Sequence, residues 1–438
     1  MHRLSGVVLS TRDGAASHAR GLTTKILARH GAGDAEPGAL AMVTCDLVMM
    51  NDVSGSLAMR AFERMGATRV FDPERVVLVA DHFVPAKDVR SAELAGDLRR
   101  FGERHGIAHY YELGRTVEAG IEHTLLPELG LVSPGALIVG GDSHTCTYGA
   151  FGALGLGFGS TDIASALALG EVWVRMPETT RIDFVGQPGP WTAGKDLILA
   201  VLRQTGSSGA AYAALEFTGD VVDGLSVDDR MALCNMAIES GAKSGICTPN
   251  DAVLEWLEAR SVPRGDTLLP DDEGYDHVLR VDVDGLPPLV ARPPDPADVI
   301  AINELPSGLR LDQVYVGNCS NGTLSDLRQL VAGLAGRRVA PGTRLMVVPA
   351  SNAIHRAALA EGLTETLVAA GAVIVPPTCG ACFGGHMGIL GPGERALATT
   401  NRNFRGRMGH PESEVYLANA AVAGASAAAG AIVDPRTT

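Results

Sequence analysis

Three cysteines, Cys319, Cys379 and Cys382, are the residues of this chain whose types and spacing are best suited to chemistry. They lie in two glycine-rich segments, VGNCSNG and PPTCGACFGG, each of which follows an apolar, strand-like run. Thiolates arranged in this way can bind an iron-sulfur cluster and leave one iron without a protein ligand. Such an iron acts as a Lewis acid on a bound substrate. The pattern therefore predicts metal-assisted chemistry rather than electron transfer.

A zinc site is the main alternative for these thiols. His386 follows Cys382 by four residues and could complete a Cys3His tetrahedron. Disulfides are a weaker alternative, because seven cysteines in 438 residues with no secretory signal are typical of a reducing compartment. The role of Cys146, beside a candidate catalytic loop, stays open. Three other cysteines lie in apolar stretches and are expected to be buried and unreactive: Cys45, Cys234 and Cys247.

Two Asp/His pairs follow directly after strand-like runs. Asp81 and His82 come after VVLVA, and Asp142 and His144 come after ALIVGG, while His123 lies in a third segment, AGIEH. Each histidine alone is as easily a structural residue. Their repetition at strand ends favours acid–base chemistry, in which carboxylates hold imidazole tautomers and raise their basicity.

Polar residues in two further segments could face the same site. A predicted helix over 228–242 places Asn235 and Glu239 four residues apart on one face, which points either inward or to solvent. The segment TTNRNFRGRMG carries Asn401, Arg402 and Arg407. Because guanidinium groups bind carboxylates bidentately, these arginines suggest a di- or tricarboxylate substrate.

Strand and helix patterns alternate along the chain, which is typical of α/β proteins. Strands are predicted over 41–50, 76–79 and 136–140, and helices over 56–65 and 91–105. A glycine-rich run at 149–159 lacks the spacing of a dinucleotide loop and indicates close packing instead. A new strand pattern after Pro177 and a proline-rich segment at 286–298 mark boundaries, so three α/β domains are expected over 1–177, 178–290 and 291–438.

The composition disfavours two classes of protein. The net charge of −14 argues against a nucleic-acid binder, which needs a basic face. The apolar run at 6–9 is too short for a signal peptide, and no run of eighteen apolar residues occurs, so no membrane span is expected. These features predict a soluble, cytoplasmic enzyme.

Several motifs occur together and in one order: GDSHTCTYGAFGALGLGFGSTDIA, NMAIESGAKSGI, VGNCSNG, PPTCGACFGGHMGIL and TNRNFRGRMGHP. With them the chain, from about Gly21 to Arg436, resembles the aconitase superfamily, and within it the large subunits of the isopropylmalate and homoaconitate hydro-lyases. The resemblance implies three α/β domains around a central cluster-binding cleft, without the swivelling fourth domain of single-chain aconitases.

The resemblance also implies roles for single residues. Cys319, Cys379 and Cys382 match the ligands of a 4Fe-4S cluster with one labile iron. Asp81 with His82, and Asp142 with His144 and His123, match acid–base groups, and Ser143 matches a hydrogen-bonding contact to substrate. Asn235 and Glu239 match a helix pair near the open iron, and Asn401, Arg402 and Arg407 match a loop that contacts the cluster and binds carboxylates. Asn51 stands where relatives place a histidine or glutamine that contacts substrate.

The implied reaction is dehydration and rehydration of a hydroxy di- or tricarboxylate. Conversion of 2-isopropylmalate to 3-isopropylmalate is the first candidate, and homoaconitate or dimethylmalate-type substrates are the alternatives. In two-subunit relatives a small subunit carries the swivelling domain and the serine base, so such a partner is expected. RNA binding and a non-catalytic zinc role remain as alternatives, and the charge of −14 disfavours the first.

Overall fold

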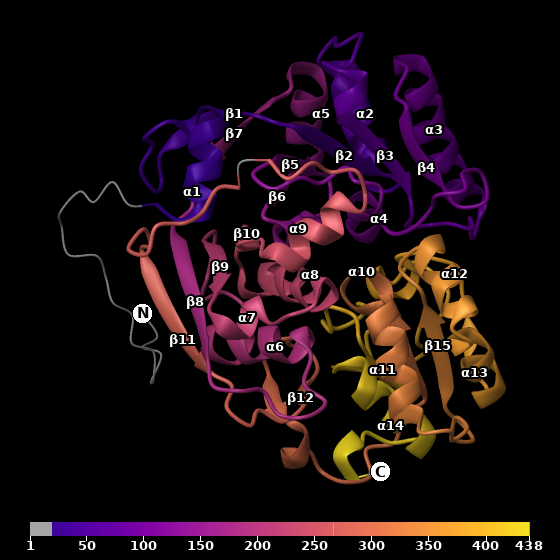
Figure 1. Ribbon diagram of the computed structural model, residues 1–438. Coiled ribbons are helices and arrows are strands. Elements are labelled where there is room, and N and C mark those ends of the chain that lie inside the picture. The colour runs from indigo at the N-terminus through magenta and orange to yellow at the C-terminus, as the bar shows by residue number, and fades with distance from the viewer. Residues whose placement is uncertain (1–19, 266, 438) are drawn as a thin grey trace.

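The computed structural model describes residues 20–265 and 267–437, whose strands form three large sheets and one small one (Figure 1). The apolar run at 6–9 lies outside the described residues. None of the described helices combines the length and the apolar character that crossing a membrane requires. The predicted α/β architecture is confirmed, while the division into domains at 177 and 290 stays a prediction.

A five-stranded parallel sheet forms from apolar runs whose central strands are buried on both faces. Its order is β4 (His109–Glu112), β3 (Val76–Ala80), β2 (Leu47–Asn51), β5 (Leu137–Gly140) and β6 (Leu154–Gly157). The helices of this part are α2 (Ser54–Arg64), α3 (Val89–His105), α4 (Glu122–Glu128) and α5 (Ser160–Leu169). Because β3, β2 and β5 are parallel neighbours, their carboxyl ends bring three polar loops to one edge of the sheet.

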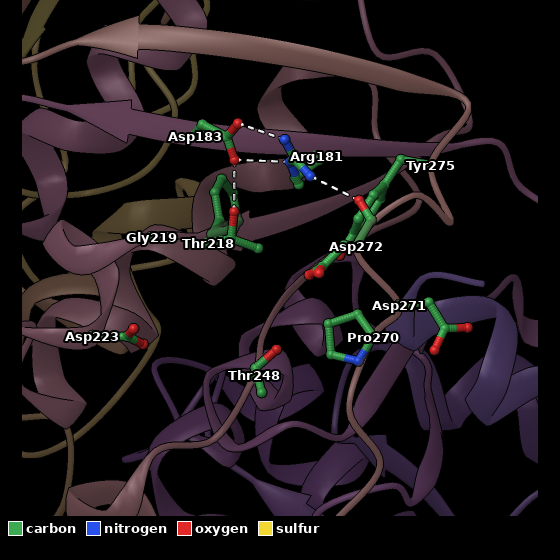
Figure 2. A pocket seen from close by; sticks show the side chains of 11 residues that line it. Arg181, Asp183, Thr218, Gly219, Asp223, Thr248, Pro270, Asp271, Asp272 and Tyr275 are labelled. Carbon is green, nitrogen blue, oxygen red and sulfur yellow. Dashed lines mark hydrogen bonds and ion pairs between the residues drawn. The ribbon is translucent and has the colours of Figure 1, made fainter. Parts of the chain in front are cut away.

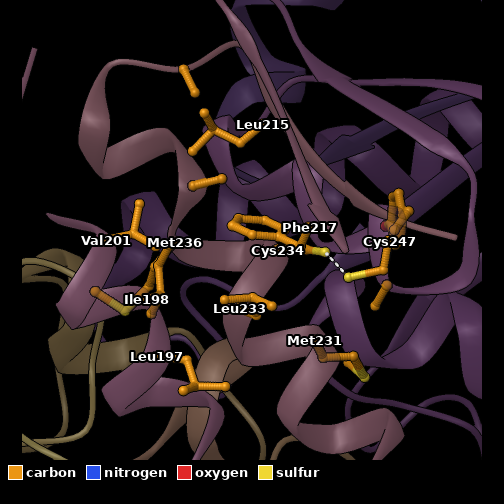
Figure 3. Close-up of a cluster of buried hydrophobic side chains, with 14 of the residues drawn as sticks. Leu197, Ile198, Val201, Leu215, Phe217, Met231, Leu233, Cys234, Met236 and Cys247 are labelled. Atoms are coloured by element: carbon orange, nitrogen blue, oxygen red, sulfur yellow. Dashed lines mark hydrogen bonds between the residues drawn. The ribbon is translucent and has the colours of Figure 1, made fainter. Parts of the chain in front are cut away.

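A four-stranded parallel sheet has the order β10 (Ser244–Cys247), β9 (Ala214–Thr218), β8 (Thr179–Val185) and β11 (His277–Asp282). Its helices are α6 (Gly194–Thr205), α7 (Asp220–Asp223), α8 (Val227–Asn235) and α9 (Asp251–Glu258). Apolar side chains of α6, β9 and α8 pack together, among them Ile198, Phe217 and Leu233 (Figure 3). This packing fixes α8, whose last residue is Asn235.

The last third of the chain forms a seven-stranded mixed sheet. Its order is β13 (Val299–Ala301), β12 (Leu289–Ala291), β18 (Glu414–Leu417), β17 (Arg395–Ala398), β14 (Gln313–Gly317), β15 (Arg344–Val348) and β16 (Val373–Ile374). The helices are α10 (Asn318–Asn321), α11 (Leu324–Leu334), α12 (Asn352–Ala360), α13 (Leu363–Ala370) and α14 (Ala420–Ala429), the orange and yellow part of Figure 1. This part meets the first sheet where the N–H of Cys379 donates to the carbonyl of Asp81 at 2.8 Å.

The single strand predicted over 41–50 is wrong. The chain instead forms β1 (Leu40–Thr44), which pairs with β7 (Glu171–Arg175) in the small antiparallel sheet, and then β2 in the five-stranded sheet. The break has a polar cause, because the Asp46 carboxylate accepts from the N–H of Leu137 at 2.8 Å and contacts His30 Nε2 at 2.6 Å. His30 is placed there by α1 (Leu22–Leu27) and the π-helical segment Ala28–Ala32.

The helix predicted over 228–242 is also wrong in its second half. Helix α8 ends at Asn235, and the chain continues as a 3-10 turn, Met236–Ser240, before Gly241 with a φ of 84°. A 3-10 turn is wound more tightly than an α-helix, so Asn235 and Glu239 do not share one α-helical face. Both side chains are buried, which excludes the alternative that they face solvent.

The close packing predicted for 149–159 is confirmed. A Cβ atom on Gly149 would lie 1.8 Å from the carbonyl oxygen of Gly245, and one on Gly155 would lie 2.0 Å from that of Thr145. Only glycine therefore allows the segment around β6 to approach its neighbours so closely.

Candidate active site

Two of the three predicted metal ligands, Cys319 and Cys382, contact a pair of asparagine amides. Cys319 is in α10, and Cys379 and Cys382 follow β16. Asn235 donates from Nδ2 to Cys319 Sγ at 3.3 Å. Asn401 lies 3.6 Å from Cys319 Sγ through Nδ2 and 3.1 Å from Cys382 Sγ through Oδ1, and it donates to Asn235 Oδ1 at 2.8 Å. Residues from four separate segments are thus joined at the thiols.

The spacing of the thiols does not suit a single ion. Zinc–sulfur bonds of about 2.3 Å place the sulfurs of a tetrahedral site about 3.8 Å apart. Among the described residues, Cys319, Cys379 and Cys382 do not form a group whose ligand atoms all lie within 4.8 Å of one another. His386, the proposed fourth zinc ligand, has its Nε2 3.2 Å from the carbonyl of His82. The geometry therefore favours a larger, multinuclear group over zinc.

The two cysteine loops are tied to each other by Asn318. Its Nδ2 donates to the carbonyls of Thr378 at 3.0 Å and Cys379 at 2.9 Å. Gly317 has a φ of 145°, and a Cβ atom there would lie 2.2 Å from a carbonyl oxygen of β15, so the close approach of the loop requires glycine. A hydrogen bond with Cys379 lowers the pKa of Cys382 to about 5, against the opposing effect of burial. The thiolate so favoured is the form that binds iron.

The three cysteines that were predicted to be buried are buried. Cys45, Cys234 and Cys247 are fully buried, as is Cys146, and all seven cysteines are free thiols. Cys234 Sγ and Cys247 Sγ lie 3.6 Å apart inside the apolar cluster of Figure 3. Burial raises the pKa of Cys146 to about 12, which makes it an unreactive thiol despite its place near the site.

Asp81 and His82 lie just beyond the end of β3. Asp81 Oδ1 is 2.6 Å from His82 Nδ1, and Asp81 Oδ2 accepts from the N–H of Glu122 at 2.8 Å. Burial lowers the pKa of His82, but Asp81 and Asp142 outweigh this effect and raise the pKa well above its ordinary value. The two carboxylates therefore favour the protonated form of His82, which can donate a proton from Nε2.

Asp142, beyond the end of β5, contacts all three predicted histidines. The distances are 3.0 Å from Oδ1 to His123 Nε2, 3.3 Å from Oδ1 to His144 Nδ1, and 3.7 Å from Oδ2 to His82 Nε2. Burial raises the pKa of Asp142, but hydrogen bonds from the histidines outweigh it and hold the pKa well below its usual range. One carboxylate thus orients imidazoles from three separate segments of the chain.

Glu239 links this group to the arginine loop. Its Oε1 lies 3.1 Å from His144 Nε2 and accepts from Arg402 Nε at 2.8 Å, while Arg402 Nη2 donates to Ser143 Oγ at 3.1 Å. Burial raises the pKa of Glu239, but His144 and Arg402 outweigh it and lower the pKa. Arg402 is therefore already paired by protein groups.

Arg407 differs from Arg402 in this respect. Its Nε is buried and has no hydrogen-bond partner in the part of the chain that the structure describes. A buried guanidinium nitrogen without a partner is costly unless a ligand completes it. Of the two predicted arginines, Arg407 is the one suited to a ligand carboxylate.

Both polar atoms of the Asn51 side chain, at the end of β2, form hydrogen bonds with protein groups. Its Oδ1 accepts from the N–H groups of Val53 at 3.0 Å and Ser54 at 2.8 Å. Its Nδ2 donates to Glu122 Oε1 at 3.1 Å. The contact that the structure gives Asn51 is therefore with a carboxyl group of the protein.

Asp52 is a residue of the site that the sequence reasoning missed. Its carboxylate accepts from the N–H groups of Asp81 at 3.2 Å, His82 at 2.9 Å and Phe83 at 2.9 Å. Asp52 therefore fixes the loop that carries His82. The sequence did carry a sign of this role, because Asp52 comes directly after the apolar run of β2, as Asp81 comes directly after that of β3.

Lys195 and Glu122 were missed as well. Lys195 is fully buried in α6, donates from Nζ to the carbonyls of Thr399 and Thr400, and so supports the loop before Asn401. Burial lowers its pKa to about 8. A lysine inside the apolar run GKDLILAVL was a usable signal for such a role. Nothing in the sequence indicated a role for Glu122 except its position next to His123.

A surface pocket of about 360 Å³ lies on the four-stranded sheet, apart from these residues (Figure 2). Arg181 lines it and is committed to Asp183 and to the carbonyl of Asp272. No predicted site residue lines this pocket, so the site described above is the better candidate for chemistry.

Fold and site together define a hydro-lyase of the aconitase type. The chain belongs to the aconitase family: a family model described as "Aconitase family (aconitate hydratase)" matches residues 24–430. Membership implies an iron-sulfur cluster, and the three buried thiols are suited to hold one.

Relatives narrow the comparison to one kind of subunit. The chain is 53% identical to "3-isopropylmalate dehydratase large subunit 2" of Rubrobacter xylanophilus, over 94% of this chain and 97% of that protein. It is 50% identical to the "3-isopropylmalate dehydratase large subunit" of Moorella thermoacetica, over 94% and 98%. The holo-form crystal structure of Thermococcus kodakaraensis aconitase X matches at 13% identity with a TM-score of 0.47, over 86% of this chain and 88% of that one, which is too distant to add to the assignment.

Proposed function

We propose that this chain is the large subunit of a 3-isopropylmalate dehydratase, which interconverts 2-isopropylmalate and 3-isopropylmalate by dehydration and rehydration. The observation that carries the proposal is the junction at Asn401, which contacts two of the buried thiols and precedes the arginine that pairs with Glu239. Metal ligands, acid–base groups and a cationic loop therefore meet in one place. The whole-length identity to large subunits of that name supports the substrate.

The cofactor of the proposal is a 4Fe-4S cluster with one labile iron. Cys319, Cys379 and Cys382 would hold it, since three thiols leave one iron of such a cluster without a protein ligand. When bound, the cluster supplies a Lewis acid that polarises a substrate C–OH bond. The amide donors of Asn235 and Asn401 at Cys319 Sγ would stabilise the charge of the ligand thiolate.

The protein groups divide the remaining tasks. Arg407 is placed to bind a substrate carboxylate, because its guanidinium has a buried nitrogen without a partner among the residues that the structure describes. His82 can deliver the proton from Nε2 to the leaving hydroxyl, because Asp81 keeps it protonated from the other side of the ring. Asp142 and Glu239 orient His144 from its two ring nitrogens.

A small subunit is the proposed partner. The name "large subunit" of the relatives implies one, and we propose that it carries the swivelling domain and the serine that removes the carbon-bound proton. The reaction then needs both chains, because the cluster-binding chain supplies the acid and the partner supplies the base. The setting we propose is leucine biosynthesis in the cytoplasm.

The test is to purify the chain without oxygen, alone and together with a matching small subunit from the same organism. We expect the pair, and not the chain alone, to interconvert the two isopropylmalates. EPR after mild oxidation should show a 3Fe signal that disappears when iron is restored. Turnover of homoaconitate or dimethylmalate, but not of isopropylmalate, by the cluster-loaded pair would overturn the substrate. Full activity of Cys382→Ser would overturn the metal assignment.

A further inference from the structure

Glu122 is a buried carboxyl group at the edge of the site. It is the first residue of α4 and is 0% exposed. Its Oε1 accepts from Asn51 Nδ2 at 3.1 Å and lies 3.5 Å from His123 Nε2. The same His123 nitrogen lies 3.0 Å from Asp142 Oδ1. The Nε2–H of His123 is therefore placed between two carboxyl groups.

The surroundings of Glu122 disfavour a second negative charge there. The titratable groups that face it are Asp81 and His82 from the loop after β3, Asp142 from the loop after β5, His123 on its own helix, and Tyr148 from the turn Ser143–Phe151. Burial, followed by the charges of Asp81 and Asp142, raises the pKa of Glu122 well above its usual value, while His82 and Asn51 oppose this. Burial beside two carboxylates therefore favours the protonated acid of Glu122 over its carboxylate.

The hydrogen bonds locate that proton. Oε1 is an acceptor from Asn51, so it is the carbonyl oxygen of the acid, and the proton is on Oε2. Oε2 is buried and has no hydrogen-bond partner among the described residues. A buried polar atom without a partner is unusual in a packed core and is tolerated mainly at functional sites.

The hydrogen bonds that the Asn51 side chain forms within the described residues all join it to protein groups. The N–H groups of Val53 and Ser54, and Ser54 Oγ, occupy its Oδ1, where Asn51 caps the start of α2, and Glu122 is the acceptor for its Nδ2. The contact that links Asn51 to the site is therefore its hydrogen bond to Glu122 Oε1.

We propose that Glu122 is a positioning residue of the site: a neutral carboxylic acid, held by Asn51, that orients the His123 imidazole beside Asp142. The proposal rests on the proposed function for its kinetic consequences. A neutral acid shares the Nε2–H of His123 without adding a second anion, so Asp142 is the charged partner of that ring among the described residues. His123 Nδ1, which is buried and has no protein partner in the described part of the chain, is then presented in one orientation.

The first test compares two substitutions in the complete enzyme, cluster and small subunit included. Glu122→Gln imitates a neutral acid and should keep kcat within a few fold of the wild type. Glu122→Ala removes the contact to His123 and should lower kcat by roughly 100-fold, with KM unchanged. The wild type should lose activity at alkaline pH as Glu122 ionises, and Glu122→Gln should lack this limb. A severe loss in Glu122→Gln at neutral pH would overturn the proposal, because it would show that a carboxylate is needed.

The second test asks how Asn51 acts. Asn51→Ser keeps an oxygen that can cap α2 but cannot reach Glu122. Its effect on kcat should not add to that of Glu122→Ala in the double variant, because both remove the same contact. A raised KM and additive effects would show instead that Asn51 binds substrate. Glu118→Gln, an exposed glutamate just before α4, is the matched control and should match the wild type.

A third measurement does not depend on turnover. Infrared difference spectra of the wild type and Glu122→Gln, in light and heavy water, should show one protonated carboxyl band at neutral pH that the variant lacks. Absence of that band from the wild type would overturn the proposal even if the enzyme is active. Its presence together with no activity on isopropylmalate would contradict the proposed function and leave the state of Glu122 established.

Discussion

Arg402 and Glu239 form a nearly buried ion pair that joins the loop after β17 to the turn after α8. Arg402 Nε lies 2.8 and 3.0 Å from the two carboxylate oxygens, and the side chain of Glu239 is only 3% exposed. Removing one partner of such a pair leaves a buried charge without compensation. The pair therefore stabilises the chain as well as orienting His144.

For this reason Glu239→Gln should lower the free energy of unfolding of the cluster-free chain by about 3 kcal/mol. Urea denaturation measures the effect. Glu414→Gln is the matched control, because Glu414 pairs with Arg395 near the surface, with 46% and 32% of the side chains exposed. Its cost should be about 1 kcal/mol or less. Equal losses of unfolding free energy in the two variants would show that the buried Glu239 pair stabilises the chain no more than the exposed pair does.

Substitution of a cluster ligand should remove the cluster without unfolding the chain. Cys319→Ser and Cys382→Ser replace a soft thiolate by a hard oxygen, so both are expected to lose most of the bound iron and sulfide. Chemical determination of iron and sulfide gives the result, and thermal unfolding checks the fold. Cys45→Ser changes an equally buried thiol outside the site and should keep the cluster. A full cluster in Cys382→Ser would contradict the ligand set.

The amide of Asn235 should tune the cluster. Asn235→Ala removes the donor 3.3 Å from Cys319 Sγ, and hydrogen bonds to ligand sulfurs favour the more negative, reduced state. A loss of about 1 kcal/mol corresponds to a one-electron potential lower by about 40 mV. EPR-monitored redox titration would detect this shift. Asn250→Ala removes the cap of α9 and a hydrogen bond to the carbonyl of Asp223, rather than a donor to a ligand sulfur, and should leave the potential unchanged.

The contact between His30 and Asp46 should make stability depend on pH. Burial lowers the pKa of His30, but the contact with Asp46 outweighs burial, so the pKa of His30 is raised. Burial raises the pKa of Asp46, but the contact with His30 outweighs burial, so the pKa of Asp46 is lowered. The stability that His30 adds to the folded chain is fully present below its unfolded pKa of about 6.5. This stability is lost as pH rises through the raised pKa of the folded state. The stability that Asp46 adds is fully present above about 3.9 and is lost as pH falls through its lowered folded pKa.

We therefore expect Asp46→Asn to lower the thermal midpoint more at about pH 5.5 than at about pH 9. The difference should correspond to about 1 kcal/mol, because the Asp46 side chain is 45% exposed and partly screened. Calorimetry at the two pH values measures it. Asp97→Asn, which breaks an exposed pair with Arg100, should show no such difference. An equal effect of Asp46→Asn at both pH values would mean that the His30 charge does not contribute.

Local patterns were enough to find most residues of the site. Asp81 follows β3 and Asp142 follows β5 as predicted, because apolar strand runs and the polar residues that end them are neighbours in sequence. The prediction of strands failed where a polar residue interrupts an apolar run. Asp46 interrupts an apolar run that reads as one strand, and its partners Leu137 and His30 are visible only in the folded chain.

The sequence by itself determined the α/β class, the three thiols and the types of group that surround them, because each depends on residues close together in the chain. Tertiary structure decided how those groups are shared. It placed three histidines on Asp142, paired Arg402 with Glu239 across 163 positions and left a buried nitrogen of Arg407 without a described partner. Only folding brings such distant groups within hydrogen-bond distance and removes the water that would otherwise solvate them, and that contact and desolvation set their protonation states.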